Sequence, residues 1–324
     1  MRRLLPVLCL LLSTGCLDID FDSPHLIQYE RIIGLRAEPP EAQFGEDVVF
    51  TALVVDETGA NLAMEPDVEL RWSVCVSLAA IVRGAGLGAG SDLEDDCREG
   101  GDDLVRLSAE GLPPDSARLP GAAVVAVIAE LMAPGGGGGG LPSIPGLDPG
   151  SARSLLTVIA EVGVPLSVRL EVYRQGELIQ TGFKRFAIVM REDPTTNPPP
   201  PRFAFDGAFV SARGEGDPTR CVPEAGPIVL DAGAEVALDP DDDEEAWLET
   251  YPVFNFDGEV QENEESAYYS WFVTAGSMAD DITQRPDDDT AWTTPEEPGT
   301  YPLWLVVRDG HLGMSWCQVD VEVR

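Results

Sequence analysis

VPLSVRLEVY, residues 164–173, is the stretch that decides the fold. Every second residue in it is apolar, and a period of two is typical of a β-strand with one buried face. The next four residues, RQGE at 174–177, have the composition of a tight turn, and the apolar pair Leu178-Ile179 follows them. The stretch therefore predicts a strand that enters an antiparallel hairpin.

Similar short strands and turns surround this hairpin. The expected strands are Ile33–Pro40, which runs into a turn, Val48–Asp56, Val68–Cys75 with alternating apolar residues, and Phe183–Val189. Short alternating strands separated by turns are typical of an antiparallel sandwich. We therefore predict one β-sandwich domain over residues 31–192.

The alternation stops between residues 76 and 161. This segment contains two glycine-rich runs, at 84–90 and 135–140, and an apolar run over 122–132 that predicts a helix. No GK[ST] sequence follows either glycine run, so neither resembles a phosphate-binding loop. We predict that residues 76–161 form a large insertion on the first sandwich, partly helical and partly disordered.

A proline-rich segment, residues 193–201, predicts a stiff linker to a second domain at 202–324. The second domain contains TTPEEPGTY at 293–301, LWLVVRDG at 303–310 and VDVEV at 319–323. Earlier come LDPDDD at 238–243 and YSW at 269–271. These sequences resemble the turn and closing strands of PKD-type, immunoglobulin-like domains, although a long acidic stretch separates the turn from YSW. The resemblance implies a second β-sandwich, so the fold class expected is all-β with two tandem immunoglobulin-like domains. Trp271 and Trp304 are expected to fill the space between its sheets.

The N-terminus has the features of an export signal. Two arginines precede the apolar run Leu4–Leu12, which is much shorter than the ~20 residues that span a bilayer. The sequence LSTGC at 12–16 resembles the lipobox of bacterial lipoproteins. This implies a signal peptide at 1–15, a lipid on Cys16 and an acidic tether over residues 16–30. Leu17 after the cysteine implies, by the same resemblance, the outer membrane.

Four further cysteines would remain after removal of the signal: Cys75, Cys97, Cys221 and Cys317. An even number in an exported chain favours disulfides. Three pairings are possible, and we favour Cys75–Cys97 and Cys221–Cys317 because each stays inside one predicted domain. A zinc site is the alternative, but the chain has no CxxC pair.

The charge of the chain is strongly acidic, with 57 acids against 21 lysines and arginines and a net charge of -36. Such a surface repels nucleic acid, which we exclude as a partner. Residues 239–265 contain no lysine or arginine, and clustered carboxylates suit calcium. The candidate ligands are Asp239, Asp241, Asp242 and Asp243. The alternative is a solvated acidic loop, because the spacing does not match an EF-hand.

No catalytic motif is recognisable. The two histidines are His25, in the expected tether, and His311, in an Asp-Gly-His turn where we expect an exposed side chain. Neither GxSxG nor HExxH occurs, and we predict that the protein is not an enzyme.

Three roles are consistent with these features. The first is a lipid-anchored structural or adhesive module of the cell envelope. The second is a subunit of an envelope secretion or surface-polymer assembly that docks a partner protein through residues 76–161. The third is a carbohydrate-binding module, for which Trp247, Tyr251 and Phe254 would form an aromatic platform for a glycan. These three side chains could equally cap the second core.

Overall fold

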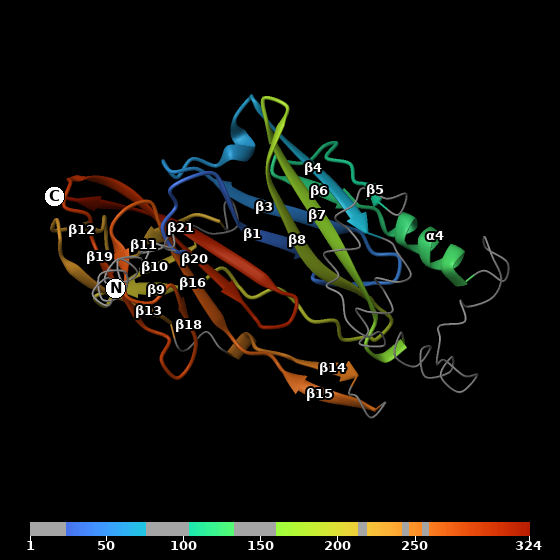
Figure 1. Ribbon diagram of the computed structural model, residues 1–324. Coiled ribbons are helices and arrows are strands. Elements are labelled where there is room, and N and C mark those ends of the chain that lie inside the picture. The colour runs from blue at the N-terminus through green and yellow to red at the C-terminus, as the bar shows by residue number, and fades with distance from the viewer. Residues whose placement is uncertain (1–23, 76–103, 133–159, 213–218, 242–245, 255–258) are drawn as a thin grey trace, which may run out of the picture.

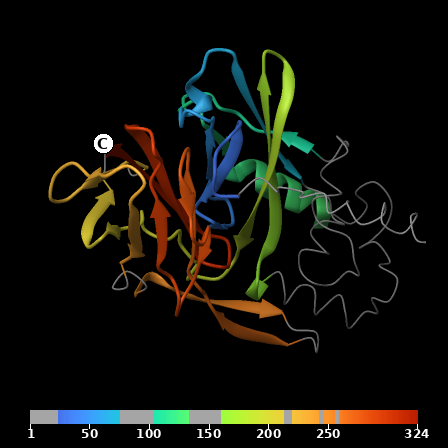
Figure 2. The ribbon, with the colours of Figure 1, turned by 60° about the vertical axis from the view of Figure 1, so that its left-hand side comes forward.

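The computed structural model describes residues 24–75, 104–132, 160–212, 219–241, 246–254 and 259–324. These residues form two β-sandwiches that lie side by side, and both views show strand β21 of the second next to strand β1 of the first (Figures 1 and 2). Within the described ranges α4 (Gly121–Met132) is the one helix described from end to end, and residues 160–161 are also helical. The predicted all-β fold is therefore confirmed.

The first sandwich has two antiparallel sheets with an added parallel edge strand. Its elements are β1 (Arg31–Glu38), β2 (Glu41–Gln43), β3 (Val48–Val55), η1 (Leu62–Met64), β4 (Val68–Cys75), β5 (Leu104–Arg106), β6 (Ser116–Leu119), β7 (Val164–Arg174) and β8 (Glu177–Val189). One sheet has the order β1-β3-β6 and the other β2-β8-β7-β4-β5, with β2 parallel to β8. This order matches strands A, B and E facing C, F and G in an immunoglobulin sandwich.

The β7–β8 hairpin is present as predicted. Its register runs from Val164 opposite Ile188 to Arg174 opposite Glu177. Gln175 and Gly176 form the turn with φ of 53° and 87°, which suits the twist of a two-residue hairpin. Leu170 and Val172 are fully buried, so the alternating residues do face the core.

The predicted insertion is wrong for residues 104–119. Strand β5 pairs with β4, and β6 pairs with β3, so both belong to the sandwich. Ala117 and Leu119 are buried in the first core. The predicted helix is confirmed as α4, whereas both glycine runs lie outside the described residues.

The second sandwich repeats the same plan. Its strands are β9 (Phe203–Phe205), β10 (Ala208–Ala212), β11 (Cys221–Pro223), β12 (Val229–Leu230), β13 (Glu235–Pro240), β14 (Thr250–Phe254), β15 (Val260–Glu264), β16 (Tyr268–Val273), β17 (Ser277–Met278), β18 (Ile282–Thr283), β19 (Thr290–Thr293), β20 (Gly299–Arg308) and β21 (Met314–Val323). The sheets have the orders β11-β10-β9-β13-β19-β17 and β12-β21-β20-β16-β18. Strand β12 is parallel to β21, as β2 is to β8. Among the described strands β14 and β15 pair only with each other, and their hairpin projects along the lower side of Figure 1.

A disulfide joins Cys221 on β11 to Cys317 on β21, with 5.5 Å between the Cα atoms. It links the edge of one sheet to a strand of the other and confirms one of the two favoured pairings. Cys75 ends β4, and Cys97 lies outside the described residues, so their pairing stays a prediction.

Residues 25–27, expected in a free tether, instead belong to the second sandwich. The amide of Ile27 donates to the carbonyl of Val273 at 2.8 Å, and the amide of Val273 donates to the carbonyl of His25 at 2.9 Å. The His25 ring is buried and accepts the amide of Met278 at 3.2 Å. The chain therefore adds a short parallel bridge to β16 before it enters the first sandwich.

A third apolar cluster lies between the two sandwiches. Its members are Ile27, Ile33, Leu53, Val55, Phe272, Trp304, Val306, Met314 and Trp316. Trp304 is fully buried here, on the outer face of β20, so the expectation that it fills the space between the sheets is wrong. Trp271 does lie in the second core as expected. Gly59 has φ of 81°, and a Cβ there would lie 2.2 Å from Pro302 across the junction. The positive φ and the short distance to Pro302 therefore both require glycine at this position.

Candidate functional site at the domain junction

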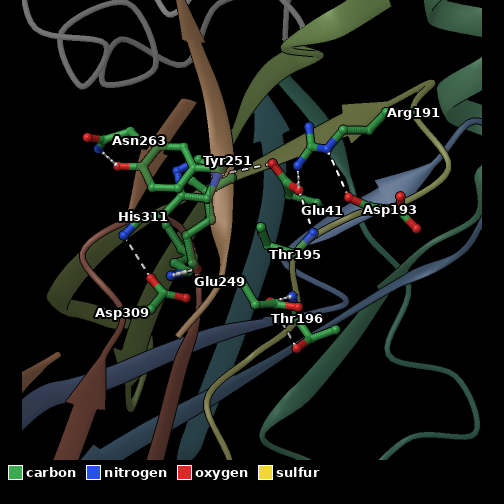
Figure 3. Close-up of polar contacts among 12 residues, drawn as sticks. Glu41, Arg191, Asp193, Thr195, Thr196, Glu249, Tyr251, Asn263, Asp309 and His311 are labelled. Carbon is green, nitrogen blue, oxygen red and sulfur yellow. Dashed lines mark hydrogen bonds and ion pairs between the residues drawn. The ribbon is translucent and has the colours of Figure 1, made fainter. Parts of the chain in front are cut away.

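Glu41, on β2 of the first sandwich, is the centre of a buried polar network between the domains (Figure 3). Its carboxylate forms an ion pair with Arg191, which follows β8. The amide of Thr195 in the linker donates to its Oε2 at 2.7 Å, and its Oε1 lies 3.0 Å from Nε2 of His311. One carboxylate thus holds the first domain, the linker and the second domain together.

His311 lies in the turn between β20 and β21, as expected. Its side chain is only 18% exposed, so the prediction that it is exposed is wrong. Its ring stacks on Tyr251 with 3.7 Å between centroids. Its amide donates to Oδ1 of Asp309 at 2.8 Å. Burial lowers the pKa of His311 to about 4. The imidazole is therefore neutral at pH 7, and Nε2 carries the proton that it donates to Glu41.

The pKa values of other titratable groups around the junction are also shifted in the direction that favours the neutral form. Burial lowers the pKa of Lys184 to about 8, and its Nζ donates to the carbonyl of Leu312. Burial raises the pKa of Asp309, and it raises that of Glu265 to about 7. Desolvation is the largest cause in each case, so water is largely excluded from this side of the junction.

The linker is clamped between the domains and does not run free. The side-chain amide of Asn197 donates to the carbonyl of Ala37 at 2.7 Å, and its Oδ1 accepts the amide of Met314 at 2.9 Å. The hydroxyl of Ser315 donates to the carbonyl of Pro199 at 2.7 Å. Both sandwiches therefore hydrogen-bond to the same few linker residues.

The structure describes two of the three side chains of the predicted aromatic platform. Trp247 is half-buried and packs against the second core. Tyr251 is only 8% exposed, stacks on His311, and accepts a hydrogen bond from Asn263 at 2.6 Å. Phe254 ends β14, and its side chain lies outside the described residues. Trp247 and Tyr251 thus pack against the second core and the junction, in line with the alternative that these side chains cap the core.

The predicted calcium ligands are not brought together in the described residues. Asp239 is exposed on β13, and Asp241 forms an ion pair with Arg202. A guanidinium at that carboxylate competes with a cation. Asp242 and Asp243 lie outside the described residues. Where the structure describes the chain, no group of three or more His, Cys, Asp or Glu side chains is arranged for a metal.

Comparisons with known proteins give no family. No family model matches the chain, and no curated protein matches it. Among solved structures, the D0-D1 domain of intimin has 9% identity and a TM-score of 0.20, covering 90% of this chain and 98% of that one. The adhesin InvE of Yersinia pseudotuberculosis has 10% identity and a TM-score of 0.20, covering 90% of this chain and 58% of that one. A nucleoside hydrolase-related protein from Saccharophagus degradans has 14% identity and a TM-score of 0.23, covering 42% and 28%. At these TM-scores the likenesses carry no inference about function.

In the part of the chain that the structure describes, no helix is long and apolar enough to cross a membrane.

Proposed function

We propose that the chain is a lipid-anchored protein of the bacterial cell envelope that acts as a rigid, non-catalytic structural or adhesive module. The observation that carries the proposal is the junction itself, in which an apolar cluster and the Glu41 network fix two immunoglobulin-like domains to each other. Domains joined by a flexible linker move independently by default. In this pair the apolar cluster and the Glu41 network oppose such motion.

Export is supported by two independent features. The sequence of residues 1–16 resembles a lipoprotein signal, and the Cys221–Cys317 disulfide needs an oxidising compartment. The lipid on Cys16 and the outer-membrane location remain part of the proposal.

The chemistry of the junction supports a non-catalytic role. A general base needs a pKa near the working pH and access to substrate. The pKa of His311 is about 4, and its ring lies beneath Tyr251 with Nε2 directed at Glu41. The polar side chains of this network bond to one another, which stabilises the contact between domains.

The test is intact-mass spectrometry of the protein purified from its native membrane without reductant. We expect a chain that starts at Cys16, carries diacylglycerol, and shows the mass deficit of formed disulfides. Small-angle scattering of the same sample should fit the compact domain pair of Figure 1. An unlipidated chain would overturn the anchor, and a scattering curve of two freely moving domains would overturn the rigid module.

A further inference from the structure

The outer face of the β16–β20 sheet extends beyond the area that the first domain covers. Tyr268, Ser270 and Phe272 of β16 face outwards there, because Tyr269 and Trp271 between them belong to the second core. Together with neighbouring residues they line a cavity of about 360 Å³. This is the lower end of the range for small-molecule sites, about 300–1,000 Å³, and suits a ligand of one ring.

Two guanidinium groups reach this cavity from different domains. Arg308 pairs opposite Tyr268 on β20, and its Nη1 donates to Oγ of Ser270 at 2.6 Å. Arg31 comes from β1 of the first sandwich and lies over the Phe272 ring, 5.5 Å from its centroid. The cavity is therefore complete only when the two domains are joined.

Arg31 donates to the carbonyl of Pro24 and Arg308 to the hydroxyl of Ser270. Neither guanidinium forms an ion pair with a carboxylate among the described residues, although acids outnumber bases by 57 to 21. Burial is the cause that lowers the pKa of Arg308, with no acid opposing it. By contrast, Arg174 and Arg202 each form ion pairs with two carboxylates. A partly buried guanidinium without an acid partner is costly unless a ligand supplies the anion.

We propose that this cavity binds a carboxylated sugar, such as a uronic acid unit of an acidic glycan. A planar carboxylate matches the donor geometry of arginine, and Arg308 and Arg31 offer it two positive charges. The apolar ring face of a sugar suits Tyr268, which is half-buried in the lining, whereas the Phe272 ring is already covered by Arg31. Asp281, also in the lining, accepts from sugar hydroxyls and disfavours a second negative charge on the ligand.

This inference deepens the binding role proposed above and rests on the joined domain pair, which the scattering measurement tests separately; it is independent of the lipid anchor. The full chain is titrated in solution with sodium glucuronate and, as the matched neutral sugar, with glucose, by calorimetry or ligand-observed NMR. We expect saturable binding of glucuronate alone. Arg308→Gln and Arg31→Gln should each weaken it about tenfold or more, and Ser270→Ala should weaken it less, because it removes only the group that orients Arg308.

The control variant is Arg118→Gln, an exposed arginine of β6 in the first sandwich, which should bind glucuronate normally. Arg31 and Arg308 belong to different domains, so at least one variant remains informative if the other fails to fold. Equal binding of glucose, or glucuronate binding that survives both substitutions, would overturn the proposal. Equal binding of acetate or of N-acetylglutamate amide would show a general carboxylate site and would overturn the sugar assignment.

The chain's own acids provide a last control, since Asp18, Asp20 and Asp22 precede Pro24, a lining residue. We expect a variant with all three changed to Asn to bind glucuronate as the parent does. A tenfold gain in affinity would identify these acids as competitors for the cavity and would overturn an external sugar as its occupant.

Discussion

Oε1 of Glu41 lies 3.0 Å from Nε2 of His311, 270 residues further along the chain, and this contact joins the first sandwich to the second. The Glu41 side chain is 2% exposed and that of His311 is 18% exposed. A carboxylate in such a place must be compensated from several sides. Arg191, Thr195 and His311 provide that compensation from three different segments of the chain.

Replacing the central carboxylate tests how much the network contributes to stability. We expect Glu41→Ala to lower the free energy of unfolding by about 3–5 kcal/mol, because it leaves Arg191 without its partner. Urea unfolding followed by tryptophan fluorescence measures this. The control is Glu57→Ala, an exposed acid in the turn after β3, which should change the value by less than about 0.5 kcal/mol. Equal effects of the two changes would contradict a stabilising network.

The pH dependence of stability should separate into two opposing contributions. The pKa of His311 falls from 6.5 to about 4 on folding. Its contribution to the free energy of unfolding is therefore full above pH 6.5 and is lost as the pH falls towards 4. The pKa of Glu265 rises from 4.5 to about 7, so its contribution is full below pH 4.5 and is lost as pH rises towards 7. In the parent protein the two slopes oppose each other between pH 4.5 and 6.5.

Single substitutions should reveal each slope. Relative to the parent, His311→Gln should lose stability as pH rises from 4.5 to 6.5, and Glu265→Gln should gain stability over the same range. Each difference has an upper limit of about 1.4 kcal/mol per pH unit. Unfolding free energies at half-unit steps of pH measure both. Parallel curves for the two variants would contradict the assigned shifts.

The apolar part of the junction gives a separate prediction. We expect Trp304→Ala to lower the free energy of unfolding by about 3–5 kcal/mol, because it leaves a cavity in a buried apolar cluster. It should also increase hydrogen exchange of the β1 and β21 amides, which flank the cluster. Leu178→Ala is the control, since Leu178 is 49% exposed on β8, and it should change neither measurement. An unchanged exchange pattern in the Trp304 variant would show that the domains are held by the polar network alone.

The disulfide offers a fourth test. We expect the double variant Cys221→Ser with Cys317→Ser to lose about 2–5 kcal/mol, since the closed loop spans 96 residues. Reductant should still lower the stability of this variant further if Cys75 and Cys97 are paired as predicted. The variant with Cys75 and Cys97 changed to Ser separates the two contributions. Insensitivity of the parent protein to reductant would contradict both pairings.

The features predictable from sequence are those with a local pattern. The alternation of 164–173 and the turn after it suffice to predict the β7–β8 hairpin, because strand period and turn chemistry act over a few residues. Strand β6 was missed because it is short, and its partner β3 precedes it by more than 60 residues.

The junction is not predictable from the sequence, for a different reason. His311 was expected to be exposed because a turn containing Asp-Gly is usually at the surface, and nothing local indicates that Tyr251 and Glu41 cover it. One signal was present in LWLVV at 303–307, which is apolar at every position. Such a run is typical of a strand buried on both faces, and the structure places Leu303 and Leu305 in the core and Trp304 in the junction.

The attachment of residues 25–27 to β16 has a mechanical consequence. The segment is bridged in parallel to the second sandwich, and the His25 ring is held by Met278. With the proposed lipid on Cys16, the second sandwich becomes the first domain to which the chain is attached after the lipid, although it is last in the sequence. A pulling force on the first domain then reaches the membrane by two load paths, along β1 and through the junction. The pairing of residues 25–27 with β16 is loaded along the strand direction, so its hydrogen bonds resist in shear and share the load.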